Sequence, residues 1–355
     1  MTSPSATASA PVRVLGSGVI GLSTALALRA AGHEVEVWAE RPAARATSAV
    51  AGGLWWPYHI EPEERVGAWA LETLAVYEEW AAEPARTGVR LVEGVHTETS
   101  FDTLGPWAGS VRGLRTATAA ESPHSPGLFG RLPVIDMPHH LAWLEERLRA
   151  AAAPVVPRTA ASLAEAAEGA RAVVNCTGLG ARSLVPDEAV HPVRGQLVLV
   201  ENPGVTTWFT STAGGGARSV YYIPQPYGLL LGGTAEEHDF RESPDPATAE
   251  AIIRDCAALR PEIAGARVLA HRVGLRPARA GGVRLAQERL PDGTPVVHNY
   301  GHGGAGVTVA WGCAREAARG VAEVAPTSGP GRRAGTVSRS GTCPTARNAS
   351  ASCST

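Results

Sequence analysis

The pattern of apolar and polar positions is clearest at the start of the chain. Residues 12–15 form a short apolar run, residues 22–31 are apolar and rich in alanine up to Gly32, and residues 35–38 are again mostly apolar. A short apolar run bounded by turns favours a strand, whereas an alanine-rich stretch that ends at glycine favours a helix. The pattern therefore predicts a strand, a helix and a second strand, which together make a βαβ unit.

Further along, the pattern changes to shorter strands with helices between them. Asp136 suits the N-cap of a helix, with Pro138 in the first turn and leucines at helical spacing behind it. The other predicted helices cover residues 67–82, 247–259 and 306–324, and strands are predicted at 172–177, 196–200, within 221–232 and at 295–299. The order predicts an α/β region followed by a second, more β-rich region.

Composition excludes several kinds of chemistry. The 355 residues include no lysine, which excludes both a Schiff-base lysine and a Walker A phosphate loop. A formal net charge of -2 provides no basic field for nucleic acid, and no apolar run is long enough to span a membrane. The five cysteines include no CxxC pair, so we expect neither a disulfide framework nor a metal site.

The two ends of the chain differ from the middle. Residues 326–355 consist mainly of Ser, Thr, Gly, Pro and Arg, with no acidic residue, and we expect a disordered tail there. Residues 1–11 lack the charged and apolar regions of a signal peptide, and the chain ends in Ser352-Cys353-Ser354-Thr355 rather than a peroxisomal signal. These features favour a bacterial cytoplasmic protein.

A glycine-rich turn occupies the first strand–helix junction. Gly16, Gly18 and Gly21 fit the G-x-G-x-x-G pattern, which allows a tight turn, close approach of a pyrophosphate and close helix–strand packing. Glu40 follows at the end of the second strand, where a carboxylate can accept hydrogen bonds from ribose hydroxyls. The context predicts dinucleotide binding, but it does not distinguish NAD from FAD.

Three later segments are candidates for the remainder of a site. The segment Asn175-Cys176-Thr177-Gly178 ends a predicted buried strand, so it either turns or passes close to the nucleotide. Arg276 lies in an apolar, glycine-containing stretch before Pro277, so it either grips a carboxylate or makes a structural salt bridge. Residues 298–306 contain four glycines ahead of a helix, and this much glycine argues against a His298–His302 metal pair.

Adjacent glutamates occur several times along the chain. Neighbouring residues on a helix or strand do not converge on one point, so these pairs do not suit acid–base dyads. We expect solvated faces at Glu63-Glu64, Glu78-Glu79, Glu145-Glu146 and Glu236-Glu237.

The chain resembles the D-amino acid oxidases and the related D-aspartate oxidases over about residues 12–325. The strongest likeness is VVHNYGHGGAG at 296–306, which continues to WGCA at 311–314. AGGLWWPY at 51–58, NCTG at 175–178, LGGT at 231–234 and VGLRPAR at 273–279 match further family segments in the family's order. The resemblance implies an α/β fold, with a Rossmann-like FAD-binding domain and a second, β-rich (α+β) substrate-binding domain.

The resemblance also implies domain limits and cofactor contacts. The FAD-binding domain would comprise residues 12–58, 139–190 and 280–325, and the substrate-binding domain residues 59–138 and 191–279. By position, non-covalent FAD would contact Gly16, Gly18, Val19, Ile20, Gly21, Glu40, Arg41, Thr47, Ser48, Gly52, Gly53, Leu54, Thr159, Thr177, Gly303, Gly304, Gly306, Val307 and Thr308.

The implied substrate contacts form a carboxylate clamp and a pocket. Arg276 and Tyr221 would bind the carboxylate, with Tyr222 as the alternative tyrosine, and the carbonyl of Gly304 would accept the amine. Trp56 and Tyr58 fall in a segment that lines the family pocket, which favours neutral, apolar side chains; Arg218 is the nearest candidate for a second cation.

The implied reaction is oxidative deamination of D-amino acids. Hydride transfer to flavin N5 and reoxidation by oxygen would give a 2-oxo acid, ammonia and hydrogen peroxide. A glycine- or sarcosine-oxidase-like flavoenzyme, a D-aspartate oxidase and a non-catalytic dinucleotide-binding protein remain alternatives. The expected partners are a small-molecule substrate and oxygen, without nucleic acid or membrane, and a homodimer is a candidate assembly.

Overall fold

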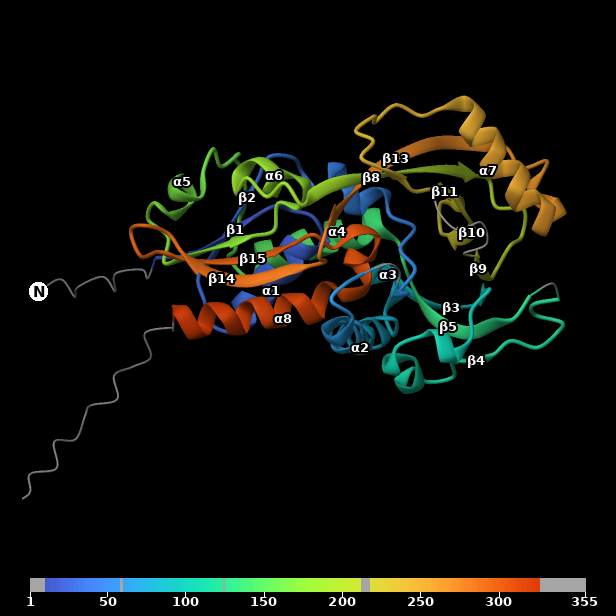
Figure 1. Ribbon diagram of the computed structural model, residues 1–355, viewed down its shortest axis with the longest axis horizontal. Helices are drawn as coiled ribbons and strands as arrows, with labels where there is room; N and C mark the ends of the chain where they lie inside the picture. The colour runs from blue at the N-terminus through green and yellow to red at the C-terminus, as the bar shows by residue number, and fades with distance from the viewer. Residues whose placement is uncertain (1–9, 58–59, 124, 212–217, 326–355) are drawn as a thin grey trace, which may run out of the picture.

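The computed structural model describes residues 10–57, 60–123, 125–211 and 218–325. The predicted tail at 326–355 and the candidate residue Tyr58 lie outside the described residues. Figure 1 shows two halves, each built on its own sheet, with the long strands β8 and β13 extending from the middle of the molecule into the second half.

Within the described residues, one sheet has six strands in the order β14-β15-β7-β1-β2-β6. Its strands are β1 (Val12–Leu15), β2 (Val35–Ala39), β6 (Val155–Pro157), β7 (Ala172–Asn175), β14 (Arg284–Arg289) and β15 (Pro295–Tyr300). Strand β14 pairs antiparallel with β15, and the other neighbours run parallel. Because β1 lies between β2 and β7, the turn that follows it meets the carboxyl ends of both neighbours.

The other sheet has nine strands among the described residues, and its main path is β12-β8-β11-β10-β9-β3-β5-β4, with β13 paired to β8. Its strands are β3 (Val89–Thr97), β4 (Arg115–Thr116), β5 (Gly127–Ile135), β8 (Val190–Val200), β9 (Trp208–Ser211), β10 (Arg218–Gln225), β11 (Gly228–Thr234), β12 (Glu236–Glu237) and β13 (Val268–Arg279). All of these pairs are antiparallel except β3 with β9, so this half is the predicted β-rich region.

Helices cover both sheets. They are α1 (Val19–Ala30), α2 (Glu63–Trp80), α3 (Pro84–Thr87), α4 (Met137–Ala150), α5 (Leu163–Ala167), α6 (Ala181–Leu184), α7 (Pro246–Leu259) and α8 (Gly306–Val324). In Figure 1, α1 and α8 lie below the six-stranded sheet, and α5 and α6 lie above it. Helix α7 packs Ile252 and Cys256 against the nine-stranded sheet, on the side where Tyr222 is also buried.

Most predicted helices and strands of the first region have the expected positions, with small shifts at their ends. Helix α1 begins at Val19, inside the glycine motif, and α2 begins at Glu63. The predicted N-cap is confirmed, since the Asp136 side chain accepts a hydrogen bond from the His139 amide. The 221–232 segment is a hairpin of β10 and β11, and β8 begins at Val190, six residues before the predicted strand.

Three long strands, β3, β5 and β13, were not predicted from the pattern. Strand β3 is hydrogen-bonded on both sides, to β5 and to β9, and both of its faces are partly covered. Strand β13 is half-buried along most of its length, so its apolar and polar residues do not alternate cleanly. Pairing with distant strands creates these elements, and a short sequence window does not contain that information.

The strands follow the predicted division of the chain. Those of the six-stranded sheet come from residues 12–58, 139–190 and 280–325, while those of the nine-stranded sheet come from 59–138 and 191–279, apart from Val190 at the start of β8. The exact domain limits stay a prediction.

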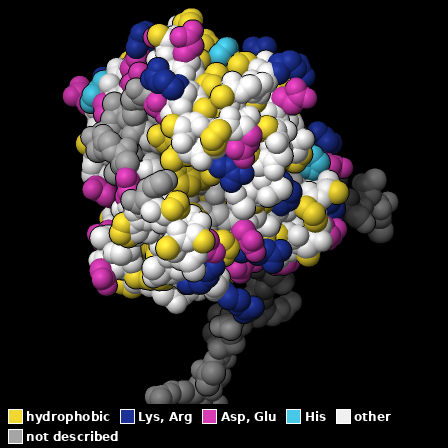
Figure 2. Space-filling view, turned by 90° about the vertical axis from the view of Figure 1, so that its right-hand side faces the viewer, with side chains coloured by type: hydrophobic (Ala, Val, Ile, Leu, Met, Phe, Trp, Pro, Cys, Tyr) yellow, Lys and Arg dark blue, Asp and Glu magenta, His cyan; other side chains and the backbone are white. Residues whose placement is uncertain are grey.

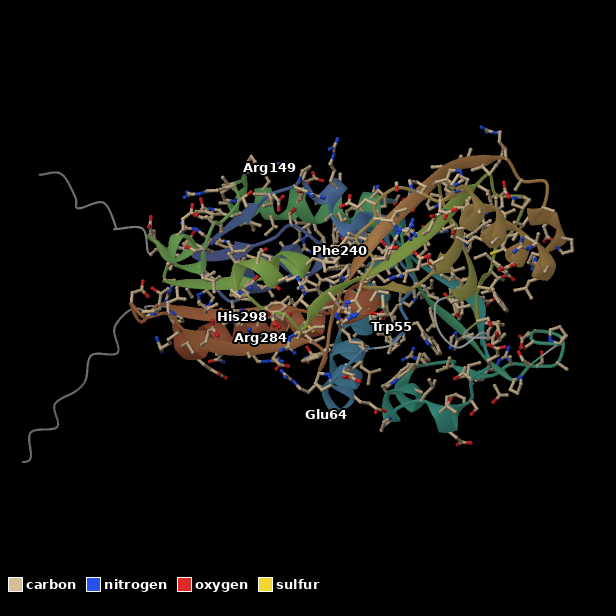
Figure 3. The ribbon with its side chains drawn as sticks, turned by 45° about the horizontal axis from the view of Figure 1, so that its top comes forward. Trp55, Glu64, Arg149, Phe240, Arg284 and His298 are labelled. Carbon is tan, nitrogen blue, oxygen red and sulfur yellow. The ribbon has the colours of Figure 1, made fainter. Side chains whose placement is uncertain are left out.

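A tryptophan-rich core joins the two halves. Trp55 is fully buried, donates its indole N–H to the carbonyl of Ala70 and packs edge-on against Trp107. Figure 3 shows Trp55 close to the junction of the two halves.

Over the described residues of the face in Figure 2, arginines and acidic side chains are interspersed, so neither sign of charge dominates. In the described part of the chain, we find no helix with the length and apolar character of a membrane span.

Candidate active site

A cavity of about 810 Å³ lies between the two sheets, which is within the range of small-molecule and cofactor sites. One end is lined by the turn after β1 and by Glu40 after β2, and the other by Tyr221 of β10 and Arg276 of β13. Between them lie the segment 46–54 and the glycines that precede α8. The cavity therefore brings together residues from both ends of the chain.

Two of the three motif glycines are required by their surroundings, and the third begins the helix. Gly16 has a positive φ of 107°, and a Cβ there would overlap the carbonyl oxygen of Cys176. A Cβ at Gly21 would overlap the carbonyl oxygen of Gly16, so this glycine packs helix against turn and does not line the cavity. Gly18 is the N-cap of α1 and has no side-chain cap, which leaves the helix N-terminus open toward the cavity.

The groups around this helix N-terminus suit a dinucleotide. The amide of Val19 donates to Ser48 Oγ over 3.1 Å, which draws the segment 46–54 toward the turn. Glu40 lies 3.9 Å from Arg41 Nε, is 66% exposed on its side chain and lines the same end of the cavity, so its carboxylate can also face a ribose. The positive end of the helix dipole suits a pyrophosphate, and the carboxylate at the end of the second strand suits ribose hydroxyls.

Two buried side-chain polar atoms of residues that line the cavity lack partners among the described residues. They are Asn299 Oδ1 and His302 Nε2, and both residues line the cavity. Burial lowers the pKa of His302 to about 3, so the imidazole is neutral. Because an unpaired buried polar atom costs free energy, a ligand with hydrogen-bonding atoms fits this position.

The opposite wall is one row of paired positions across the nine-stranded sheet. His96 pairs with Thr210, Thr210 with Tyr221, Tyr221 with Gly232, and Gly232 with Leu197. Paired residues of neighbouring strands lie on the same face of a sheet, and here that face is the cavity wall. The Tyr221 ring lies against Gly232 and Gly233, where a Cβ would collide with it.

Arg276 extends from β13 onto this wall. Its Nη1 donates to the carbonyl of Thr234 over 2.8 Å, and the guanidinium covers Gly195, where a Cβ would overlap it. Among the described residues, no carboxylate lies within ion-pair distance of this guanidinium. The structure therefore excludes, for the described residues, the structural salt bridge that the sequence left open, and Arg276 can still pair with an anion.

Most of the residues singled out by resemblance line this cavity. The cavity walls include Gly16, Gly18, Val19, Ile20, Glu40, Arg41, Thr47, Ser48, Gly52, Gly53, Leu54, Trp56, Thr159, Thr177, Tyr221, Arg276, Gly303, Gly304, Gly306 and Val307. Thr308 lies behind the wall and exchanges hydrogen bonds with the backbone of Trp56. Tyr222 faces the other side of the sheet and stacks on Phe209, so Tyr221 is the tyrosine that faces the cavity.

The sequence did not single out three further wall residues, His96, Thr210 and Ile223. His96 Nδ1 lies 2.6 Å from Thr210 Oγ1, and its ring packs on Trp56 with centroids 4.6 Å apart. Burial lowers the pKa of His96 to about 4, so this side chain is uncharged at neutral pH. Ile223, two residues after Tyr221, could have been found from the two-residue period of a strand.

The chain is similar to a known family and to named relatives. The model of the FAD dependent oxidoreductase family DAO matches residues 12–319. A D-amino-acid oxidase from Streptomyces coelicolor is 60% identical over 309 residues, which cover 87% of this chain and 95% of the relative. A D-amino-acid oxidase from Rubrobacter xylanophilus is 50% identical over 310 residues, covering 86% and 94%.

The fold has a clear match among solved structures as well. The crystal structure of glycine oxidase from Geobacillus kaustophilus superposes with a TM-score of 0.71 and 20% identity, covering 90% of this chain and 99% of that one. At this identity the likeness concerns the fold alone. The family match spans both halves of the molecule and the cavity between them, and the chain belongs to the DAO family of FAD-dependent oxidoreductases.

Proposed function

We propose that the protein oxidises D-amino acids to imino acids, with FAD bound in the cavity and oxygen as the final electron acceptor. The observation that carries this proposal is Arg276, a guanidinium on the cavity wall without a carboxylate partner in the described part of the chain. An amino acid supplies that carboxylate, and the two relatives above are named D-amino-acid oxidases. A non-catalytic dinucleotide-binding protein would leave this cation without a role.

Three groups of this chain hold the substrate in the proposed complex. Arg276 pairs with the carboxylate, the hydroxyl of Tyr221 donates to it, and the backbone carbonyl of Gly304 accepts from the amine. With carboxylate and amine fixed, only one enantiomer directs its Cα–H toward the middle of the cavity. The selection of one enantiomer thus follows from two fixed points and one reacting bond, and the names of the two relatives favour the D-enantiomer.

The cofactor contacts are those of the nucleotide end. The open N-terminus of α1 would hold the pyrophosphate, Glu40 would accept from ribose hydroxyls, and the glycines before α8 would contact the flavin. When bound, FAD supplies the hydride acceptor and, with oxygen, the route to hydrogen peroxide. We expect non-covalent binding, so acid precipitation should release all flavin colour from the protein.

We propose that the preferred substrates carry neutral, apolar side chains. Leu54, Trp56 and Ile223 give this wall an apolar character, and His96 adds no charge because burial keeps its pKa near 4. An acidic side chain would need a second cation there, and burying it unpaired is costly. The candidate cation Arg218 begins β10, but its side chain lies outside those described.

The test of the proposed function is a peroxide assay on a panel of substrates. D-alanine, D-valine and D-methionine should give peroxide and 2-oxo acid, whereas their L-enantiomers should not. Higher kcat/KM on glycine or sarcosine would replace the proposal with the glycine-oxidase-like alternative, and higher kcat/KM on D-aspartate would reverse the preference. Absence of turnover by flavin-loaded protein on every member of the panel would leave only the non-catalytic alternative.

The cellular setting is part of the same proposal. We expect a cytoplasmic enzyme, and we keep a homodimer as the candidate assembly. Cell fractionation tests the location, and sedimentation of the flavin-loaded protein tests the assembly.

A further inference from the structure

A group of two histidines and one glutamate lies at an edge of the nine-stranded sheet. His191 belongs to β8, Glu237 to β12, and His238 follows directly after β12. One possible ligand atom from each residue lies within 4.8 Å of the others. Donor sets of imidazole nitrogens and a carboxylate oxygen are typical of zinc sites with three protein ligands.

The hydrogen bonds of His191 fix which ring nitrogen carries a proton. Nδ1 lies 3.1 Å from the carbonyl oxygen of Ala189, and a carbonyl only accepts, so Nδ1 is the donor. In the neutral ring, Nε2 is then a bare acceptor, yet it faces a carboxylate oxygen of Glu237 at 2.9 Å. Two acceptors at this distance need a positive charge between them, which is either a second proton on the ring or a metal ion.

The surroundings leave these ligands available. The neighbouring acidic side chains form ion pairs with arginines. Glu236 pairs with the buried Arg194, and Asp239 pairs with Arg241. Glu237 remains 60% exposed and faces His191 instead. The Glu236-Glu237 pair is therefore not the uniform solvated face that the sequence suggested.

The third ligand is held in position by the backbone. The amide of His238 donates to the carbonyl of Pro192, next to His191 on β8. The φ of His238 is 58°, in the left-handed region that few residues other than glycine adopt, and its ring stacks on that of His191 with centroids 4.5 Å apart. Ligand atoms on a tetrahedral zinc ion are roughly 3.3 Å apart, and imidazole nitrogens bind a metal in the plane of the ring, so the ring of His238 must rotate out of the stack to close the site.

We propose that His191, Glu237 and His238 form a surface site for a divalent transition-metal ion of the Zn²⁺ type, with water completing the coordination. His191 has the second-shell contact that metal-binding histidines commonly make, from the other ring nitrogen to a backbone carbonyl. Such an ion would tie the segment 235–242 to β8. That segment contributes Ala235 and Glu242 to the cavity wall, and it carries the exposed Phe240, which is labelled in Figure 3.

The test is calorimetric titration of tag-free, flavin-loaded protein with ZnCl₂ after EDTA treatment and dialysis. We expect one Zn²⁺ per chain with a dissociation constant tighter than about 10 μM. Glu237→Gln should weaken binding by at least about tenfold, because even outer-shell changes in metal sites have that effect. The variant amide can still donate to His191 Nε2, so the local fold should survive.

Two more variants separate a site from scattered surface histidines. His238→Ala should abolish the stoichiometric binding, while His271→Ala, at an exposed histidine of β13, should leave it unchanged. Absence of a stoichiometric site in the wild-type protein would overturn the proposal. Zn²⁺ binding by Glu237→Gln and His238→Ala as tight as that of the wild-type protein would also overturn it, and a His191–Glu237 ion pair would remain. The readout is metal binding itself, so it does not depend on which substrate the enzyme oxidises.

Discussion

The two ends of the cavity are assembled in different ways. The nucleotide end comes mainly from one stretch of sequence, in which a strand, three glycines, a helix and an acidic residue follow each other between Val12 and Glu40. The substrate end comes from β3, β9, β10 and β13, which lie far apart in the sequence and meet only through strand pairing. The first end is local in the chain, and the second depends on the register of a whole sheet.

This difference has consequences for how each end tolerates substitution. At the nucleotide end, most contacts come from backbone groups at a helix N-terminus, so one side chain contributes a limited share. At the substrate end, the guanidinium of Arg276 is the charged group aimed at the ligand, supported by Gly195 beneath it. We therefore expect single substitutions to have larger effects at the substrate end.

The largest effect is expected for Arg276→Ala. Losing a bidentate, charge-assisted pair leaves the substrate carboxylate desolvated, which costs on the order of 3–5 kcal/mol or roughly two to four decades in kcat/KM. Arg276→Lys should recover only part of this, because an ammonium lacks the planar fork. Arg272→Ala, on the same strand but stacked on Tyr227, is the matched control and should stay close to wild type.

Gly195→Ala should have the next largest effect, although it touches no ligand. The added Cβ would overlap the Arg276 guanidinium and displace it, and a displacement of about 1 Å can cost roughly 100-fold in rate. FAD affinity should not change. Gly265→Ala, where a Cβ meets nothing within 4 Å, is the control. Wild-type kinetics for Gly195→Ala would show that the position of the guanidinium is not critical.

Glu40→Ala should weaken FAD binding while leaving the fold intact. The lost hydrogen bonds to the ribose are worth about 1.5–3 kcal/mol at most, or roughly 10- to 100-fold in the FAD dissociation constant. Fluorescence titration of apoprotein with FAD measures this change. Glu34→Ala, which removes a surface partner of Arg29, should not alter it. An unchanged constant for Glu40→Ala would remove this residue from the site.

The last effect is on the pH dependence of stability rather than on ligand binding, and it concerns His96. Burial lowers the pKa of His96 from 6.5 to about 4, so between these values the unfolded chain binds a proton that the folded chain does not. Stability therefore falls as pH decreases through this window, by about 1.4 kcal/mol per pH unit for one histidine. In urea unfolding of flavin-loaded protein, the free energy of unfolding should fall with decreasing pH less steeply for His96→Gln than for wild type, by about 1.4 kcal/mol per pH unit. The same pH dependence in both proteins would contradict the lowered pKa of His96.

The same contrast explains what the sequence could predict. The βαβ unit was predictable because Val12 to Glu40 carries the glycines, the helix and the acidic residue in one window. Arg276 and Tyr221 became candidates through family resemblance, since the apolar setting of Arg276 alone left a structural salt bridge open. The structure resolves that alternative, because no described carboxylate pairs with Arg276.

Other parts of the site could not be predicted for physical reasons. His96 lies in β3, whose two faces are both partly covered, so no clean alternation indicates the strand or its inward face. Its place on the cavity wall follows from pairing with Thr210, more than a hundred residues later. The choice between Tyr221 and Tyr222 likewise depends on the register of β10 against β9 and β11.

The central claim is that one cavity has a nucleotide end and a separate carboxylate-binding end at Arg276. Benzoate is a carboxylate probe that perturbs a nearby flavin spectrum, so its titration into flavin-loaded Arg276→Ala tests the claim directly. We predict that the variant keeps its flavin and loses benzoate affinity by roughly 100-fold or more, in line with the loss of about 3 kcal/mol or more from a buried ionic pair. Benzoate binding within about threefold of wild type, a difference below 1 kcal/mol, would contradict the claim.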